Sequence, residues 1–239
     1  MHGAAGPAGR LMAWLGGLIF VGSLVYGVWS YAVRYGRVAF EAPEPAALAG
    51  ALAANLALFG IFAAHHSIMA RSGAKRRLGR YLPPALERTL YVWIGSVLFL
   101  VTCAWWQEIP VLLYRVDGAW QLPCRAVQLA GVWLTLRAAG AIDPLELAGI
   151  RQAQGQAASP RFRIVGPYQV VRHPIYLGWV LMTFAMPAMT GSRLSFAAIS
   201  TAYLVAAVPF EERSLVETFG DEYRAYQARV RWRMIPGVY

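Results

Sequence analysis

Two short stretches in the C-terminal third of the sequence hold residue types that can do chemistry. Residues 166–178 read GPYQVVRHPIYLG, in which Arg172 and His173 come directly before Pro174. Proline is favoured at the first position of a helix, so this stretch predicts a turn followed by a helix start. The free N–H groups and positive end of such a helix suit a carboxylate or another anion. Taken alone, an Arg-His-Pro sequence at a helix start is more often an interfacial anchor than a binding site.

The second stretch begins with two adjacent acidic residues. Glu211 and Glu212 directly follow Phe210, where a long apolar run ends. Adjacent carboxylates at a membrane boundary are costly, which favours a functional interpretation. The alternative is N-terminal charge on a cytosolic helix whose apolar stripe we interpret as packing: Leu215, Phe219, Tyr223, Tyr226 and Val230.

Further candidates lie in the N-terminal half of the sequence. His65 and His66 come near the end of the second apolar run, and Glu87 and Arg88 come just before the third. A histidine could act as a base for a thiol substrate, because the thiolate is the reactive form. The alternative for the histidines is contact with lipid headgroups. For Glu87, an ion pair with Arg88 or an orienting role is favoured over a role as base.

The elements that must position these residues are transmembrane helices. The 239-residue chain is 58% hydrophobic and 14% charged, which is unlike a soluble domain. Apolar runs of about 20 residues span a bilayer as helices, and the sequence has such runs at 11–33, 46–68, 89–106 and 122–142. Two shorter runs, 175–190 and 194–210, predict a tight antiparallel helical hairpin. We therefore predict an all-α, polytopic transmembrane bundle of six spans, or five, in a single membrane-embedded domain over 1–239, with N-terminal spans in 1–142 and a loop, hairpin and tail in 143–239.

The distribution of basic residues predicts the orientation of the chain in the membrane. The net charge is +10, and the basic residues form short clusters between the apolar runs, at 71–88, 151–172 and 213–233. Anionic lipid headgroups and the positive-inside rule explain these clusters, so nucleic-acid binding is disfavoured and the C-terminus is expected in the cytosol of an inner-membrane protein. Arg34 and Arg37 oppose this orientation locally. The two cysteines, Cys103 and Cys124, have no metal-ligand or redox spacing.

The two C-terminal stretches carry a family resemblance. GPYQVVRHPIYLG and FEERSLVETFGDEYRAYQARV, followed by Met-Ile-Pro at 234–236, resemble the isoprenylcysteine carboxyl methyltransferase and phospholipid methyltransferase superfamily of membrane enzymes. In that family S-adenosylmethionine binds between the hairpin and the cytosolic tail. The resemblance implies that the cofactor-binding residues are Phe162, Arg163, Ile164, Tyr168, Arg172, His173, Pro174, Ile175, Tyr176, Glu211 and Glu212.

The N-terminal half narrows this resemblance. The segments AHHSIMAR at 64–71, LERTLYV at 86–92, WWQ at 105–107 and DPLELAGIRQ at 143–152 are similar to the bacterial thiol S-methyltransferase branch, whose known substrate is methanethiol. Prenylcysteine carboxyl methyltransferases have an arginine where this chain has Ala207, although Arg213 or Arg229 could substitute. The resemblance therefore implies a small lipophilic thiol as substrate, with His65, His66, Glu87 and Arg213 as candidate catalytic residues. Prenylcysteine carboxyl methylation, phospholipid N-methylation and a non-enzymatic membrane protein with the same fold are the alternatives.

Overall fold

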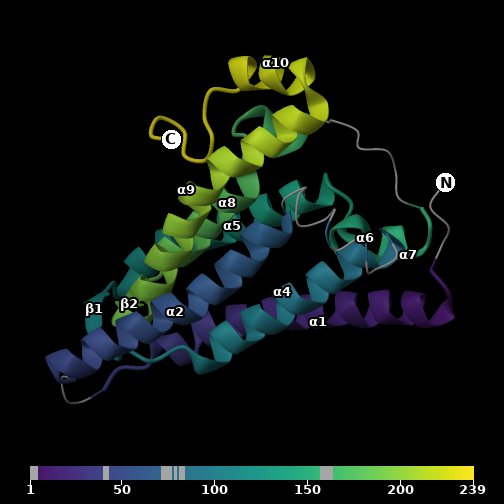
Figure 1. Ribbon diagram of the computed structural model, residues 1–239. Helices are drawn as coiled ribbons and strands as arrows, with labels where there is room; N and C mark the ends of the chain where they lie inside the picture. The colour runs from purple at the N-terminus through teal and green to yellow at the C-terminus, as the bar shows by residue number, and fades with distance from the viewer. Residues whose placement is uncertain (1–4, 40–42, 71–76, 78–79, 81–83, 157–163) are drawn as a thin grey trace. The chain divides into compact units, whose positions relative to one another are not determined.

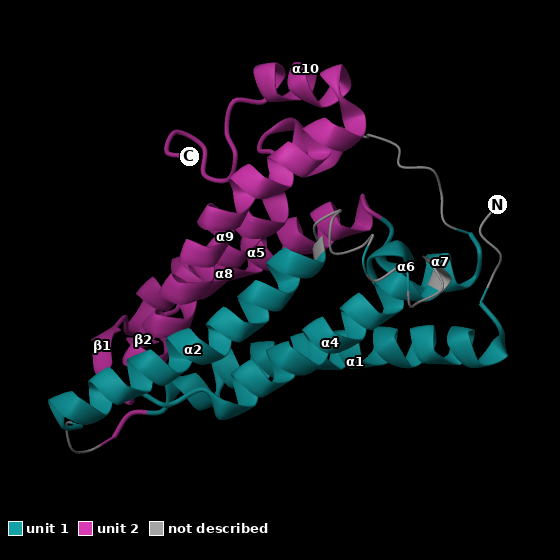
Figure 2. Cartoon of the chain, viewed as in Figure 1, with its two compact units in different colours: residues 1–37, 41–109, 143–159 teal, residues 38–40, 110–142, 160–239 magenta. Residues whose placement is uncertain are grey.

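The computed structural model spans residues 1–239 and describes all of them except 1–4, 40–42, 71–76, 78–79, 81–83 and 157–163. Helices make up most of the described chain (Figure 1). Its contacts divide it into two compact units (Figure 2). The first comprises residues 1–37, 41–109 and 143–159, and the second comprises residues 38–40, 110–142 and 160–239.

The first unit is built on three long helices: α1 (Pro7–Ala32), α2 (Pro45–Ala70) and α4 (Pro84–Trp105). The short elements η1 (Arg34–Gly36), α6 (Pro144–Leu147) and α7 (Ile150–Ala153) complete it. Glycines in α1 let bulky side chains of α4 approach closely, as expected for packed membrane helices: the indole of Trp93 lies against Gly16 and donates to the carbonyl of Met12 at 2.9 Å. The helix α7 is fixed to α1 by an apolar cluster that includes Ala13 and Ile150.

The second unit contains the elements that carry the two C-terminal stretches. In chain order these are β1 (Leu112–Arg115), η2 (Gly118–Trp120), α5 (Gln121–Gly140), η3 (Gly166–Gln169), α8 (Pro174–Phe184), β2 (Ala188–Thr190), α9 (Gly191–Phe219) and α10 (Asp221–Arg229). The helices α5 and α8 approach at Gly131 and Gly178, where a Cβ added to Gly178 would lie 2.7 Å from the carbonyl oxygen of Gly131. Between α8 and α9, the indole N–H of Trp179 donates to the hydroxyl of Ser200 at 2.9 Å.

The predicted helix over 175–190 is wrong in its second half. The helix α8 ends at Phe184, and Ala188–Thr190 form the strand β2, which pairs antiparallel with β1. Pro187 explains the early end, because proline disfavours a helical conformation in the preceding residue and cannot donate a backbone hydrogen bond. The all-α prediction is otherwise confirmed in the described chain, whose strands are these two short ones.

The last long helix extends further than its apolar run. We predicted an end at Phe210, but α9 continues through Pro209 to Phe219. Gly220, with a φ of +58°, then separates it from α10. The predicted apolar stripe is confirmed as packing, because Tyr223, Tyr226 and Val230 form a buried cluster against residues that include Leu215 and Phe219.

Four helices of the described chain are long and apolar enough to cross a membrane. They cover Pro7–Gly36, Pro45–Met69, Leu86–Trp105 and Gly191–Phe219. These helices expose large apolar side chains, including those of Leu18, Val25 and Leu56, which lipid would cover. The structure therefore supports a multi-pass membrane protein. The predicted span at 122–142 is a helix, α5, but is not one of the four, and α8 has 11 residues.

Candidate functional site

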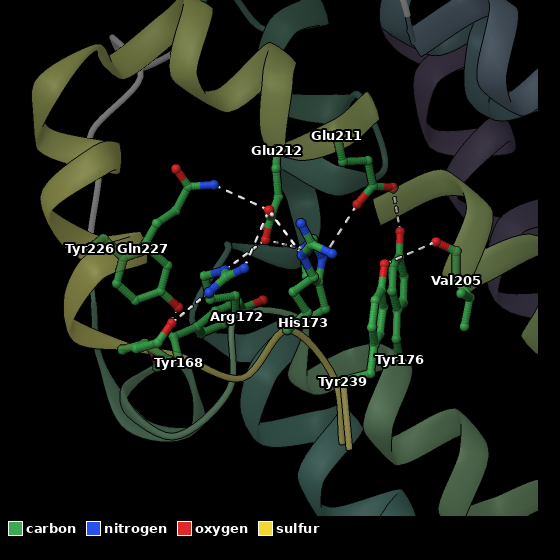
Figure 3. A network of polar contacts seen from close by, with 12 residues as sticks. Tyr168, Arg172, His173, Tyr176, Val205, Glu211, Glu212, Tyr226, Gln227 and Tyr239 are labelled. Carbon is green, nitrogen blue, oxygen red and sulfur yellow. Dashed lines mark hydrogen bonds and ion pairs between the residues drawn. The ribbon is translucent and has the colours of Figure 1, made fainter. Parts of the chain in front are cut away.

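A buried ion pair joins the start of α8 to the C-terminal half of α9. Arg172 Nε donates to Glu212 Oε1 at 2.6 Å, and Arg172 Nη2 donates to Glu212 Oε2 at 3.3 Å. The two side chains are 7% and 6% exposed, so water screens the pair little. Figure 3 shows this pair at the centre of a larger polar network. This bidentate pair fixes two residues that are 40 positions apart in the sequence relative to each other.

The same arginine holds the end of the chain. Its Nη1 donates to the carbonyl oxygens of Val230 and Arg231 at 2.6 and 3.0 Å. The backbone N–H of Arg172 donates to the carbonyl of Trp232 at 3.0 Å, and that of His173 donates to the carbonyl of Arg233 at 2.7 Å. The C-terminal segment therefore lies directly against the residues that begin α8.

Glu211 occupies a different environment from its neighbour. It accepts a hydrogen bond from the hydroxyl of Tyr176, and its Oε2 lies 3.5 Å from Nδ1 of His173. The rings of His173 and Tyr176 stack, with centroids 5.3 Å apart. Because the Glu211 side chain is 36% exposed, this carboxylate is accessible, while Glu212 is enclosed. In Figure 3, His173 lies between the two glutamates, and its Nε2 is 3.4 Å from Glu212 Oε1.

A second group of aromatic residues borders the network. Burial, and to a smaller extent the negative charge of Glu211, raises the pKa of Tyr168 to about 12. Burial also raises the pKa of Tyr223 and of Tyr226. These hydroxyls are therefore neutral near pH 7. The hydroxyl of Tyr226 donates to the carbonyl of Tyr168 at 2.7 Å, which fixes η3 against α10.

The remaining predicted cofactor residues are partly placed. Pro174 is buried and Ile175 is half-buried, both in the first turn of α8. Ile164 packs against the cluster of Tyr223, Tyr226 and Val230. Phe162 and Arg163 lie outside the described residues.

Arg213, the candidate on the substrate side, is exposed. Its guanidinium carbon lies 5.7 Å from the ring centroid of Phe210. In the same helix, Ala207 is half-buried.

His65 and His66 of the first unit both contact a tyrosine. The hydroxyl of Tyr91 lies 2.7 Å from Nδ1 of His66, and the ring of His65 stacks on that of Tyr91 with centroids 5.8 Å apart. Arg88 places its guanidinium carbon 5.2 Å from the same ring centroid. Glu87, one residue before Arg88, is half-buried in the first turn of α4.

Sequence reasoning missed Tyr91 and Gln227. Tyr91 lies three residues after Arg88 in α4, so the two side chains share one face of the helix, and this spacing could have predicted their contact. Gln227 Nε2 donates to Glu212 Oε2 at 3.1 Å, across a separation that no local pattern predicts.

Comparison with known proteins decides the family. A family model described as phospholipid methyltransferase matches residues 153–222, which contain the first C-terminal stretch and the second as far as Glu222. A methanethiol S-methyltransferase of Bradyrhizobium diazoefficiens is 38% identical over 194 residues, covering 78% of this chain and 74% of the relative. The chain belongs to the methanethiol S-methyltransferase family.

Other members of the family agree. A methanethiol S-methyltransferase of Mycobacterium tuberculosis is 37% identical, covering 75% of this chain and 76% of the relative. Another, from Crocosphaera subtropica, is 30% identical, covering 88% of this chain and 85% of the relative. No solved structure matches the chain.

Membership confirms the predicted enzyme class. The chain is a methyltransferase, and such an enzyme requires a methyl donor. A donor that carries positive charge suits the network chemically, because Glu211 presents a partly exposed carboxylate beside two stacked rings. The network lies in the second unit, and the cluster around Tyr91 lies in the first.

Proposed function

We propose that the chain transfers the methyl group of S-adenosylmethionine to a small lipophilic thiol such as methanethiol. The observation that carries the proposal is the group formed by Glu211, Tyr176 and His173 at the start of α8. This group falls within the residues matched by a methyltransferase family model. The similarity to methanethiol S-methyltransferases extends over most of the chain, which supports a thiol as the acceptor.

The donor side of the reaction requires a carboxylate and a stacking surface. S-adenosylmethionine supplies a methyl group that is already activated by a positively charged sulfur. Glu211 would bind its positive charge or its polar groups, and His173 and Tyr176 would orient it by ring contacts. A charge-assisted hydrogen bond of this kind contributes about 1.5–3 kcal/mol. Tyr168, Pro174 and Ile175 remain proposed contacts, as do Phe162, Arg163 and Ile164.

The acceptor side requires loss of a proton, because the thiolate is the nucleophile. His65 and His66 are the proposed bases, and the hydroxyl of Tyr91 would orient His66. A histidine would take the proton of the thiol, and the thiolate sulfur would bond to the methyl carbon as the bond from that carbon to the donor's sulfonium sulfur breaks. The products would be a thioether and S-adenosylhomocysteine. Lipid-facing helices favour a lipophilic acceptor, since such a molecule concentrates in the bilayer.

A carboxylate acceptor is disfavoured by the residue at position 207. Burying an ionised carboxylate without a partner is costly, and Ala207 supplies no positive charge. Arg213, the proposed substitute, is exposed beside Phe210. Prenylcysteine methylation is therefore the weaker candidate.

We further propose that the chain is a single domain of the inner membrane with six crossings, or five, and a C-terminus in the cytosol. The helices α8 and α9 would form the last hairpin, and the basic residues of 213–233 support the orientation. A cysteine at the exposed position Ser214 should resist an impermeant thiol reagent in sealed cells. Labelling at this position before lysis would show that the C-terminus lies on the opposite side of the membrane.

Donor binding tests the proposed site. Calorimetry with S-adenosylmethionine should show affinity lowered by about 10-fold or more in Glu211→Gln and His173→Ala. Glu217→Gln, an exposed carboxylate on the same helix, is the matched control and should bind as the wild type does. Unchanged affinity in both site variants would remove the proposed site.

A turnover panel tests the acceptor. Protein in lipid vesicles would be given labelled donor with methanethiol, a prenylcysteine or phosphatidylethanolamine in parallel. Label should appear in dimethyl sulfide. Label in a methyl ester or in the phospholipid headgroup would replace the proposed acceptor with that one.

A further inference from the structure

The side chains of Arg172 and Glu212 are already engaged by the protein itself. Three nitrogens of Arg172 donate to Glu212, Val230 and Arg231. Both oxygens of Glu212 accept hydrogen bonds, Oε1 from Arg172 and Oε2 from Arg172 and Gln227. Glu212 also lies 3.4 Å from Nε2 of His173 and 3.5 Å from Nε of Arg233, a residue of the C-terminal segment. Removing Glu212 would leave the buried guanidinium of Arg172 without its carboxylate, and removing Arg172 would leave Glu212 with its longer contacts to Arg233 and His173; both changes are unfavourable. The pair is therefore suited to hold parts of the protein together.

The part held in place is the C-terminal segment Val230–Met234, which we call the strap. Val171 and Trp232 form a parallel bridge, so the strap lies alongside the residues just before α8. The carbonyl of Arg233 accepts the backbone N–H of His173, the residue that precedes the helix. Met234 is buried, which anchors the far end of the strap.

The strap thus acts on the residue that the donor site requires. His173 is fixed through its backbone by the strap, and its ring stacks on Tyr176 and lies near Glu211. Freeing the strap would release the backbone of His173 and with it the arrangement of the two rings. Glu211 itself makes its described contacts to Tyr176 and His173, on the accessible side of the network.

We propose that Arg172 and Glu212 are positioning residues that fasten the strap to the start of α8, and that Glu211 is the carboxylate that faces the donor's positive charge. The identity of the donor rests on the proposed function. The fastening of the strap is a property of the donor-free protein, so the two can be tested separately.

Amide hydrogen exchange tests the strap without any ligand. The N–H groups of Arg172 and His173 donate to strap carbonyls, so their exchange reports opening of the strap. Protection of these two amides should fall by at least about 10-fold in Glu212→Gln and by a smaller factor in Gln227→Ala. Glu211→Gln, the matched control on the adjacent residue, should keep wild-type protection.

Affinity for two ligands tests the roles of the two glutamates. S-adenosylmethionine has a positively charged sulfur, and the sulfur of S-adenosylhomocysteine is neutral. Glu211→Gln should weaken binding of the charged ligand more than binding of the neutral one. Glu212→Gln should weaken binding of both ligands by the same factor, because that factor is set by the fraction of molecules in which the strap is closed. The kcat of this variant at saturating donor should equal that of the wild type.

Two results would overturn the inference. One is wild-type amide protection in both Glu212→Gln and Gln227→Ala. The other is a selective loss of the charged ligand in Glu212→Gln, which would make Glu212 a donor contact. If Glu212→Gln does not fold, Gln227→Ala decides by the same two measurements. If the wild type binds neither ligand, the proposed donor is wrong, and the exchange data still decide the role of the strap.

Discussion

Gly178→Ala should destabilise the protein because α5 and α8 touch at this residue. A Cβ at position 178 would lie 2.7 Å from the carbonyl oxygen of Gly131 and 3.2 Å from the backbone nitrogen of Thr135. Backbone atoms of a neighbouring helix cannot rotate away as a side chain can, so the helices must separate. Overpacking of this kind costs about 1–3 kcal/mol. For a chain of this length, that cost lowers the thermal midpoint by about 2–12 °C.

The effect should reach the site as well as the fold. The helix α8 begins at the residue after His173 and carries Tyr176 in its first turn, so displacement of α8 moves both rings. Donor affinity should therefore fall along with the thermal midpoint. Thermal unfolding in detergent and calorimetry with S-adenosylmethionine on one preparation would measure both effects.

Gly60→Ala is the matched control. Gly60 lies inside α2, is exposed, and would place its Cβ in open space. Alanine there restricts the unfolded chain without a clash, so the thermal midpoint should stay unchanged or rise. Equal stability of Gly178→Ala and Gly60→Ala would refute the inferred close contact of α5 and α8.

Three further outcomes are expected. Arg172→Met should destabilise the strap by about 3–5 kcal/mol, since the buried Glu212 loses its bidentate partner and keeps the longer contacts to Arg233 and His173. The double variant Arg172→Met/Glu212→Leu should recover part of the loss, and strictly additive losses in amide protection would contradict the coupling of the two residues. Tyr91→Phe removes the hydrogen bond to His66 and should lower turnover by about 10-fold or more with donor affinity unchanged, as measured by kcat beside calorimetry. The pKa of Tyr168, about 12, lies above its unfolded value of about 10, so the folded state retains a proton that the unfolded state has lost. The contribution of Tyr168 to stability should thus be constant below about pH 10 and be lost between about pH 10 and 12, so the thermal midpoint should fall less over that range in Tyr168→Phe than in wild type. An equal fall in both proteins would show that Tyr168 is not buried.

The long apolar runs predicted the helices of the first unit well, because a charge-free run of that length has one stable conformation in a bilayer. The runs 11–33 and 46–68 match α1 and α2, with ends that differ by a few residues. Hydropathy predicted the element ends less well where other effects compete. Pro187 ends α8 early, and α9 extends past its apolar part because packing of Leu215 and Phe219 stabilises the added turns.

The sequence predicted that several residues of the candidate site lie close together but not which contacts each of them makes, and their role in donor binding stays a prediction. The resemblance brought Arg172, His173, Tyr176, Glu211 and Glu212 together, and the structure has them in one network. The bonds from Arg172 to residues 58 and 59 positions away depend on how the chain folds back, which residue spacing does not encode. Adjacent glutamates on a helix point in different directions, and the contacts made by each become visible in the structure.

Product analysis tests the central claim most directly. Protein in lipid vesicles would receive methanethiol and S-adenosylmethionine with a deuterated methyl group, and the headspace would be analysed by gas chromatography and mass spectrometry. We predict dimethyl sulfide with one deuterated methyl group, formed at wild-type rate by Glu217→Gln and at a strongly reduced rate by Glu211→Gln. Vesicles that bind the donor but form no labelled dimethyl sulfide would contradict the account.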